Sequence, residues 1–600
     1  MAAATASGGG LRRANSEYAE AWVRARAGVG AASPRLSLSV SAVAQDAGRT
    51  LGEQGAKGAA ATAFPVVVTL FTGDWWDAAQ IYRAWALPSA SWTAKGPVAE
   101  RSDVPHWLLG MTTWINSHWQ GRDIFNTTWG DPHVMQHAAA AVARRFGLAG
   151  ALGGLGLHWY EWDHYAFDTH YPEYFPVRDG FKEAVAALRA ADVDVRVAPY
   201  INGRIYDQAA EKWSKDHARA HMCKRATAYN LNETQSHLAL YDESYGSGAV
   251  FAVSCPHTSY WQDTIGGIAT SLVADYGTSG VYIDQVAAAG PRGCWDPTHQ
   301  HTLGGGSYWV DGYRTLLDKA RAGVGSNSVL LTESNAEPFM DGINVFLTLV
   351  GFGSADFAGA SRIVPVFPSI YGGYYVAMGA EFFQEDLTGP TPDVFSAKIA
   401  KQFLFGAQMG WFSLGGRSNQ VPYMGIYEQL LSPTYDPEIA LLQRLAARKV
   451  LANPWLQDGS HMRELPLSVS LLDDAAAAAA ADVVVHVPRA SPSMQQTYEH
   501  LRTSAHAAKL QYAPVMSAAW LRRDGSSLLV ALVSVGRKGT HHVTASLDMR
   551  QFGFGGAATK FKVVDLVSGQ SKGTFPSTAV PVAQLLQPHD VELLVISPEN

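Results

Sequence analysis

Two short apolar runs, Gly280-Val-Tyr-Ile-Asp284 and Val329-Leu-Leu-Thr-Glu333, each end abruptly in a carboxylate. Uninterrupted apolar runs of this length are typical of parallel strands that are buried on both faces. In a (β/α)8 barrel, the functional side chains gather where such strands end. We therefore expect Asp284 and Glu333 to face one cleft.

Apolar runs alternate with amphipathic helices from residue 106 onward, which indicates a βα architecture. The expected strands are Leu108–Trp114, Leu152–Trp159, Val193–Tyr200, Gly280–Asp284, Val329–Glu333, Ile343–Leu349, Ile363–Phe367 and Met409–Leu414. The helices expected between them include Pro132–Phe146, Gly180–Ala191, Tyr260–Tyr276 and Tyr308–Ala322. The predicted fold class is therefore α/β, a decorated (β/α)8 TIM barrel over residues 106–455.

The segments on either side of the barrel differ from it in pattern. Residues 1–63 predict a poorly ordered or truncated N-terminal segment, and residues 64–105 predict a remnant β segment, a strand over 64–71, and a docking helix. Residues 456–509 predict a linker with a low-complexity alanine insertion. Short alternating strands over 510–600 predict a C-terminal antiparallel β-sandwich.

The docking helix is expected to begin after Asp74, which is placed to cap it, and to end at Pro88. Ile81, Tyr82 and Trp85 share one face of this helix. That face is expected to pack against the barrel.

Composition excludes several classes of partner. A net charge of -7 and a pI near 6.3, with no dense Lys/Arg patch, argue against nucleic acid and anionic membranes. No apolar stretch is long enough to span a membrane, and the N-terminus lacks the apolar core of a secretory signal. Compartment and oligomeric state are left undetermined.

The chain offers no recognised cofactor or metal motif. Its three cysteines, Cys223, Cys255 and Cys294, lack a CxxC spacing, and there is no HExxH, so neither a zinc site nor a disulfide framework is expected. There is also no serine-nucleophile elbow, no phosphate-binding loop and no dinucleotide-binding glycine motif. We expect no metal and no organic cofactor.

A pair of carboxylates can cleave a glycosidic bond, because one attacks the anomeric carbon while the other protonates the leaving oxygen. Asp284 suits the first role and Glu333 the second. Alternatively, each could cap a turn or pair with a cation, as strand-end acids often do. Other acids near the expected rim could take the acid role, namely Glu161, Asp163, Asp168, Glu337, Asp356, Glu381, Glu385 and Asp386.

Aromatic and polar side chains near the same strand ends could bind a sugar, whose apolar faces suit flat rings. The predicted substrate-binding residues are Trp159, Tyr160, Trp162, His170, Tyr200, Asn202, Arg204, Tyr282, Gln285 and Trp295. Asn202 could hold a hydroxyl and Arg204 could orient a carboxylate, although either could be structural. Alternatively, the rings that follow the second expected strand could pack against one another within their own loop and bind no sugar.

Two motifs carry a resemblance to known enzymes. Tyr282-Ile-Asp284-Gln285 and Thr332-Glu333-Ser334 are similar to the nucleophile and acid/base strands of retaining α-glycosidases, including α-amylase-like enzymes and endo-α-N-acetylgalactosaminidases. Residues 73–86 with Pro199-Tyr-Ile-Asn-Gly-Arg204 also resemble an uncharacterised family of glycosidase-like barrel proteins flanked by β-sandwiches. The resemblance covers roughly residues 64–600. Tyr282 stands where α-amylase-like enzymes carry an Arg, and the large N-terminal β-sandwich is mostly missing, as in an incomplete gene product.

These observations favour a glycoside hydrolase that cleaves an α-linked oligo- or polysaccharide by double displacement. A non-catalytic carbohydrate-binding barrel is the main alternative, and it requires no particular distance between the acids. A barrel lyase or isomerase is a further alternative, but its expected phosphate- or metal-binding feature is not found.

Overall fold

The structure is a computed structural model, and it describes most of the chain outside residues 1–66. The described residues are 21–26, 35–40, 67, 69–117, 131–148, 153–191, 193–225, 238–241, 247–348, 364–389, 393–415, 425–471, 513–555 and 558–599. For residues 21–40, the description is limited to two strands of backbone.

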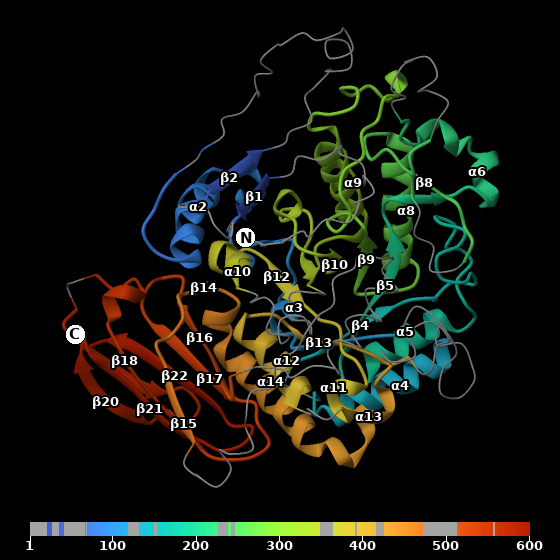
Figure 1. Cartoon of the computed structure of the whole chain (residues 1–600). Coiled ribbons are helices and arrows are strands. Elements are labelled where there is room, and N and C mark those ends of the chain that lie inside the picture. Colours follow the sequence, from blue (N-terminus) through green and yellow to red (C-terminus); the bar gives the residue numbers. More distant parts are fainter. Residues whose placement is uncertain are drawn as a thin grey trace.

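Eight parallel strands form the central sheet, in the order β12-β11-β10-β9-β5-β4-β3-β13. In chain order they are β3 (Thr113–Asn116), β4 (Leu155–Trp159), β5 (Val195–Asn202), β9 (Gly280–Asp284), β10 (Val329–Glu333), β11 (Val345–Leu347), β12 (Val376–Met378) and β13 (Met409–Ser413). A parallel bridge between Met378 and Gln408 brings the two edge strands together and nearly closes the sheet. This arrangement confirms the predicted (β/α)8 barrel (Figure 1).

Helices cover the outside of the barrel, as the sequence pattern predicted. They include α4 (Pro132–Arg145), α5 (Phe181–Ala190), α8 (Ser259–Ala274), α9 (Tyr308–Val324) and α12 (Asp393–Leu404). Asp131 begins α4 by accepting hydrogen bonds from the amides of His133 and Val134, while Pro132 occupies the first turn, where no amide donor is needed. Adjacent helices then pack against each other, α4 on α5 and α8 on α9.

Two of the expected strands are corrected by the structure. Residues 106–110 form a helix, α3 (His106–Gly110), so the first strand begins only at Thr113. The expected strand Ile363–Phe367 is also wrong, because Val366–Tyr371 is helix α10 and the seventh strand is β12. Pro365, inside the expected strand, explains this result: proline has no amide to donate within a central strand, and here it stands at the N-cap of α10.

The long interval between the third and fourth strands holds an insertion, residues 203–258. It contains the small antiparallel sheet β6-β8-β7, formed by β6 (Ile205–Asp207), β7 (Leu240–Tyr241) and β8 (Phe251–Val253), and the short helix α6 (Glu211–Lys215). The insertion lies beside α8 in Figure 1 and leads directly into that helix.

Helix α2 (Trp75–Ser89) begins as predicted, with the Asp74 carboxylate accepting a hydrogen bond from the Trp76 amide. It docks on α10, where Gln80 donates to the carbonyl of Ser369. The predicted docking face is partly wrong, because Ile81 and Trp85 are about half exposed, at 47% and 50%.

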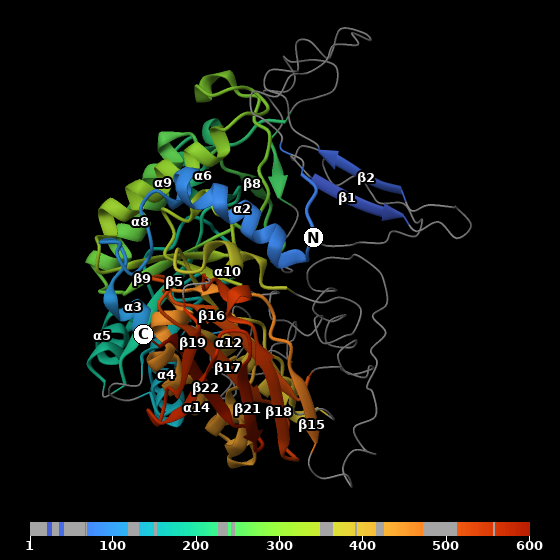
Figure 2. The same ribbon diagram turned by 90° about the vertical axis from the view of Figure 1, so that its left-hand side faces the viewer.

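The β segment preceding α2 differs from the expected strand over residues 64–71. Among the described residues of that range, 67 and 69–71, none is in a strand. The N-terminal β structure is instead a two-stranded antiparallel pair, β1 (Ala21–Arg26) and β2 (Arg35–Val40), which projects from the barrel in Figure 2.

Two antiparallel sheets form the predicted C-terminal sandwich. The larger has the order β14-β16-β17-β22-β19-β20 and the smaller β15-β18-β21. Their strands are β14 (Ser460–His461), β15 (Ser468–Leu471), β16 (Val515–Leu521), β17 (Leu528–Ser534), β18 (His541–Leu547), β19 (Lys560–Asp565), β20 (Ser571–Pro576), β21 (Val580–Leu586) and β22 (Val591–Pro598). The expected linker, residues 456–509, thus contributes β14 and β15 to the sandwich.

Helix α14 (Asp436–Leu456) lies between the barrel and the sandwich (Figure 1). Trp455 on this helix donates to the Ser527 hydroxyl at 3.2 Å, and Trp520 of β16 donates to the Leu404 carbonyl at 2.8 Å. These buried indoles join the two cores. None of the described helices is both long and apolar enough to cross a membrane.

One buried ion pair lies between α11 (Glu385–Thr388) and α12. The Lys398 ammonium donates to Asp386 Oδ2 at 2.7 Å and to the Glu381 carbonyl at 3.1 Å, and the side chains of both charged residues are almost fully buried. Removing one charge of such a pair leaves the other without compensation in a medium that solvates it poorly.

We therefore expect Lys398→Met to lower the free energy of unfolding by about 3–5 kcal/mol. The double variant Lys398→Met/Asp386→Asn should recover much of this loss. Denaturant titration followed by fluorescence measures both values. Lys215→Met, which breaks the exposed pair with Glu211, is the matched control and should leave stability nearly unchanged, because water screens this pair. Equal effects at the two sites would contradict the prediction.

Candidate active site

The candidate active site is built on strands β5, β9 and β10. Asn202 pairs with Asp284 across β5 and β9, and Tyr282 pairs with Leu331 across β9 and β10. Asp284 lies two residues after Tyr282 and Glu333 two residues after Leu331. The two carboxylates therefore lie level on adjacent strands. Because side chains alternate between faces, both also point to the same side of the sheet.

Both carboxylates stand at the boundary between the barrel core and its rim. The four residues that precede each of them in its strand are buried, whereas Asp284 and Glu333 themselves are only partly buried. The next residues, Gln285 and Ser334, have φ values of 60° and 61°, in the left-handed region. The chain therefore turns sharply away immediately after each carboxylate.

Tyr200 and Asn202 hold Asp284 from the neighbouring strand. The Tyr200 hydroxyl donates to Asp284 Oδ2 at 2.9 Å, and the Asn202 amide Nδ2 donates to the same hydroxyl at 3.2 Å. Burial, reinforced by the charge of Asp284, raises the pKa of Tyr200 well above its usual value, so its proton stays available for donation. A hydrogen bond to the carboxylate stabilises its charged form.

Tyr160, directly after β4, lies close to both carboxylates. Burial raises the pKa of Tyr160 first, and the negative charges of Asp284 and Glu333 raise it further. Its ring stacks on Tyr200 with 4.8 Å between centroids. Because Tyr200 bonds Asp284, this ring contact places Tyr160 beside the carboxylate pair.

His158 joins this aromatic group, although it is absent from the predicted binding residues. Its ring lies 4.4 Å from Tyr160 and 3.9 Å from Tyr282. Its Nδ1 accepts a hydrogen bond from Trp411 Nε1 at 3.0 Å, and burial lowers its pKa well below 6.5, so the neutral ring carries its proton on Nε2. Among the described residues, this Nε2 has no hydrogen-bond partner.

Four of the predicted binding residues have structural contacts elsewhere. Trp159 faces the helix layer and packs on Phe181, while the Trp162 indole donates to the Tyr200 carbonyl at 2.8 Å. Arg204 donates to the carbonyl of Gly290. The amide of His170 donates to an Asp207 oxygen.

The remaining predicted residues divide between the rim and the loop that follows it. Asn202 is fully buried, and its Oδ1 accepts from the amides of Arg204 and Ile205, which fixes the turn after β5. Gln285 donates to the Tyr241 hydroxyl at 3.0 Å. Trp295 lies farther along the chain, where its ring fills the space that a side chain at Gly304 would need.

The competing acids differ in their surroundings. Glu337 accepts hydrogen bonds from Tyr82 and Tyr371, and Asp386 pairs with Lys398, while Asp356 lies outside the described residues. Asp168 and Glu381 are buried, and Glu385 is the first residue of α11. The last two acids, Glu161 and Asp163, follow Tyr160, and burial raises the pKa of each to about 7.

Residues 61–382 match the family described as a domain of unknown function (DUF6259). The chain belongs to this family. The match includes seven of the eight barrel strands and both carboxylates.

Two longer proteins are similar to this chain. A Monosiga brevicollis protein whose name provisionally assigns it to the glycoside hydrolases is 36% identical over 530 residues, covering 85% of this chain and 41% of that protein. A Bacteroides thetaiotaomicron protein with the same provisional assignment is 30% identical over 339 residues, covering 56% of this chain and 45% of that protein. The chain spans less than half the length of either relative. The expected relationship to an uncharacterised family of glycosidase-like barrel proteins is confirmed.

Two solved structures are similar to this chain at low sequence identity. The α-N-acetylgalactosaminidase NagBb from Bifidobacterium bifidum is 13% identical, with a TM-score of 0.46, over 63% of this chain and 58% of that one. The maltogenic α-amylase AmyB from Thermotoga neapolitana is 9% identical, with a TM-score of 0.49, over 82% of this chain and 100% of that one. Similarity at this level carries no information about substrate.

The raised pKa values of Glu161 and Asp163 predict a pH dependence of stability. Between the ordinary pKa of a carboxyl and about 7, the folded protein keeps protons that the unfolded chain has lost. Stability should therefore fall as pH rises through this window. Glu161→Gln, which cannot ionise, should flatten the decrease and raise the thermal midpoint at pH 8.

Thermal unfolding followed between pH 5 and pH 8 tests this expectation. Glu183→Gln, at an exposed position on α5, is the matched control and should leave the slope unchanged. An unaltered slope in Glu161→Gln would show that this carboxyl is already ionised in the folded protein at neutral pH.

Proposed function

We propose that this chain is a retaining glycoside hydrolase that acts on an α-linked glycan. The observation that carries the proposal is the level position of Asp284 and Glu333 on adjacent parallel strands. Adjacent strands lie about 4.8 Å apart. Strands at this spacing can hold two side-chain carboxyl groups at the roughly 5–5.5 Å that retaining enzymes use, whereas inverting enzymes need 6.5–9.5 Å.

Asp284 takes the role of nucleophile in this mechanism. Its carboxylate bonds to the anomeric carbon while the glycosidic bond to the leaving oxygen breaks, which gives a glycosyl ester on the enzyme. The hydrogen bond from Tyr200 supports this assignment, because it favours the charged carboxylate and fixes one of its oxygens in place.

Glu333 takes the role of acid and then of base. Its carboxylic acid gives a proton to the leaving oxygen as the glycosidic bond breaks. The resulting carboxylate then removes a proton from water, whose oxygen attacks the anomeric carbon and displaces Asp284. Two inversions at the same carbon return the product to the original configuration.

The rings around the carboxylates suit a bound sugar. Of these rings, Tyr160 and Tyr200 keep a small exposed part, at 6% and 5%, for contact with the apolar face of a pyranose, whereas His158 and Tyr282 are almost fully buried and pack against them. The provisional names of the two longer relatives support the reaction class. The resemblance of the Asp284 and Glu333 motifs to retaining α-glycosidases supports the α linkage.

Replacing either carboxyl should abolish most of the activity. We expect Asp284→Asn and Glu333→Gln to lower the turnover of aryl α-glycosides by about 100- to 10,000-fold. Proton NMR of the initial product should show retained configuration for the wild type. Glu337→Gln is a matched control, since Glu337 is bound by Tyr82 and Tyr371, and it should remain active.

External azide separates the two roles. It should restore turnover of Glu333→Ala as a glycosyl azide of retained configuration, and of Asp284→Ala as one of inverted configuration. Activity that survives both substitutions would refute the site. A wild-type chain that binds α-glycans without cleaving them would favour a carbohydrate-binding barrel instead.

The hydrogen bond from Tyr200 should contribute measurably to catalysis. We expect Tyr200→Phe to lower kcat/KM by about 10- to 100-fold, since a hydrogen bond to a charged group contributes about 1.5–3 kcal/mol. Tyr371→Phe removes a comparable hydroxyl that donates to Glu337, and it should have little effect. Equal kinetics in Tyr200→Phe and the wild type would mean that the bond has no role in the reaction.

A further inference from the structure

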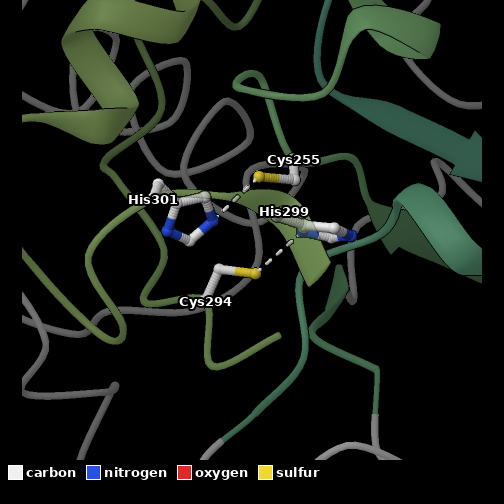
Figure 3. A group of neighbouring side chains, drawn as sticks. All are labelled: Cys255, Cys294, His299 and His301. Atoms are coloured by element: carbon white, nitrogen blue, oxygen red, sulfur yellow. Dashed lines mark hydrogen bonds between the residues drawn. The ribbon is translucent and has the colours of Figure 1, made fainter. Parts of the chain in front are cut away.

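A second cluster of chemically reactive side chains lies where the segment that follows β9 meets the end of the insertion between β5 and β9. Cys255, Cys294, His299 and His301 place one sulfur or nitrogen atom each within 4.8 Å of all the others. Figure 3 shows the two sulfurs and the two rings converging from opposite sides. Three of these residues are buried and His301 is partly buried, so the group lies largely away from water.

The hydrogen bonds of the two imidazoles orient one nitrogen of each toward a sulfur. His299 Nε2 lies 2.7 Å from the Ala220 carbonyl, which can only accept, so this nitrogen carries the proton. His299 Nδ1 is then the unprotonated nitrogen, and it lies 3.4 Å from Cys294 Sγ.

His301 has the same arrangement with its nitrogens exchanged. Its Nδ1 lies 2.8 Å from the Thr302 carbonyl, and its Nε2 lies 3.4 Å from Cys255 Sγ. Metal-binding histidines usually donate their other ring proton to a carbonyl or carboxylate in this way, because the bond fixes both the tautomer and the ring orientation.

We propose that Cys255, Cys294, His299 and His301 bind a zinc ion. Zn–S bonds near 2.3 Å and Zn–N bonds near 2.0–2.1 Å place the sulfur and nitrogen ligands of a tetrahedral site about 3.6 Å apart. The two sulfur–nitrogen distances of 3.4 Å are close to this value. Two thiolates also neutralise the charge of the ion, which suits a buried position.

The site is structural rather than catalytic. Four protein ligands complete the tetrahedral coordination of zinc and leave no position for water or substrate, unlike the three-ligand sites of zinc enzymes. The glycosidase chemistry proposed for Asp284 and Glu333 does not involve the ion. The two proposals can therefore fail independently.

The ion would join two segments that are distant in sequence. Cys255 ends the insertion between β5 and β9, whereas the other three ligands belong to the segment that leaves β9 after Asp284. Existing bonds already bring these segments together: the Trp295 amide donates to the Lys224 carbonyl, and Arg204 donates to Gly290. A bound ion would further stabilise the contact between these two segments.

A disulfide is the competing use of these sulfurs. Cys223 neighbours Cys255 and Cys294, and its thiol donates to the Ser254 carbonyl at 3.7 Å. A disulfide would have no need of imidazole lone pairs directed at the sulfurs, whereas a metal ion requires them. Cys223 therefore serves as the matched control, a buried cysteine beside the site but outside the proposed ligand set.

Metal analysis of the full chain tests the proposal. The protein is expressed with added zinc, purified without chelators and measured by plasma mass spectrometry. We expect close to one zinc per chain in the wild type and in Cys223→Ser. Cys294→Ser and His299→Ala should lose most of it, with circular dichroism checking that each variant is folded.

Cobalt substitution gives a readout that does not depend on the variants. Co²⁺ added to the chelator-treated wild type should produce the visible bands of a tetrahedral site and a thiolate charge-transfer band. Three results would overturn the proposal: a wild type with neither zinc nor these bands, a native disulfide between Cys255 and Cys294 in peptide mapping, or equal zinc loss in Cys223→Ser and Cys294→Ser.

Discussion

The register of three parallel strands, β5, β9 and β10, is the constraint on which the candidate site depends. Because side chains alternate along a strand, a slip of one residue would turn Asp284 or Glu333 from the inside of the barrel to the helix layer. Gly280 helps to fix this register. A Cβ at this position would lie 2.4 Å from the Val329 carbonyl oxygen, so only glycine allows β9 and β10 to approach as they do.

The aromatic group gives the two carboxylates their particular surroundings. His158, Tyr160, Tyr200 and Tyr282 come from three neighbouring strands and their ends, and their rings exclude water from one side of the acids. Charges interact more strongly where water is excluded. Burial also keeps the tyrosine protons in place and leaves His158 neutral, so this side of the site consists of hydrogen-bond donors without a positive charge.

Much of the barrel could be predicted from the sequence, because parallel strands buried on both faces produce apolar runs that end where the burial ends. Asp284 and Glu333 stand out for this reason. The seventh strand could not be found in this way, since β12 has only three residues and the nearby apolar run, Val366–Tyr371, is helical. Three residues carry too little periodicity to be separated from a buried loop.

Which side chains face the inside of the barrel beside the carboxylates is harder to predict from the sequence, because the aromatic segment after the second strand continues past the end of that strand. Because side chains alternate between the two faces of a strand, neighbouring residues of this segment point to opposite sides of the sheet. His158 pairs with Ala198, two residues before Tyr200, so His158 shares the inner face with Tyr200 while Trp159 faces the helices. Trp162 could not be assigned by this rule, since it lies beyond the strand end.

The cysteines show a different limit of sequence reasoning. A zinc motif is recognised when its ligands are close in sequence, but Cys255 reaches the other three ligands only because the insertion folds back along β6 and β8. This return brings the insertion against the segment that begins at Gln285, directly after Asp284. Gln285 itself is bonded to Tyr241 of the insertion. The carboxyl end of β9 thus contacts the neighbouring barrel strands on one side and the insertion on the other. An ion bound by Cys255 and Cys294 would make the contact with the insertion more rigid.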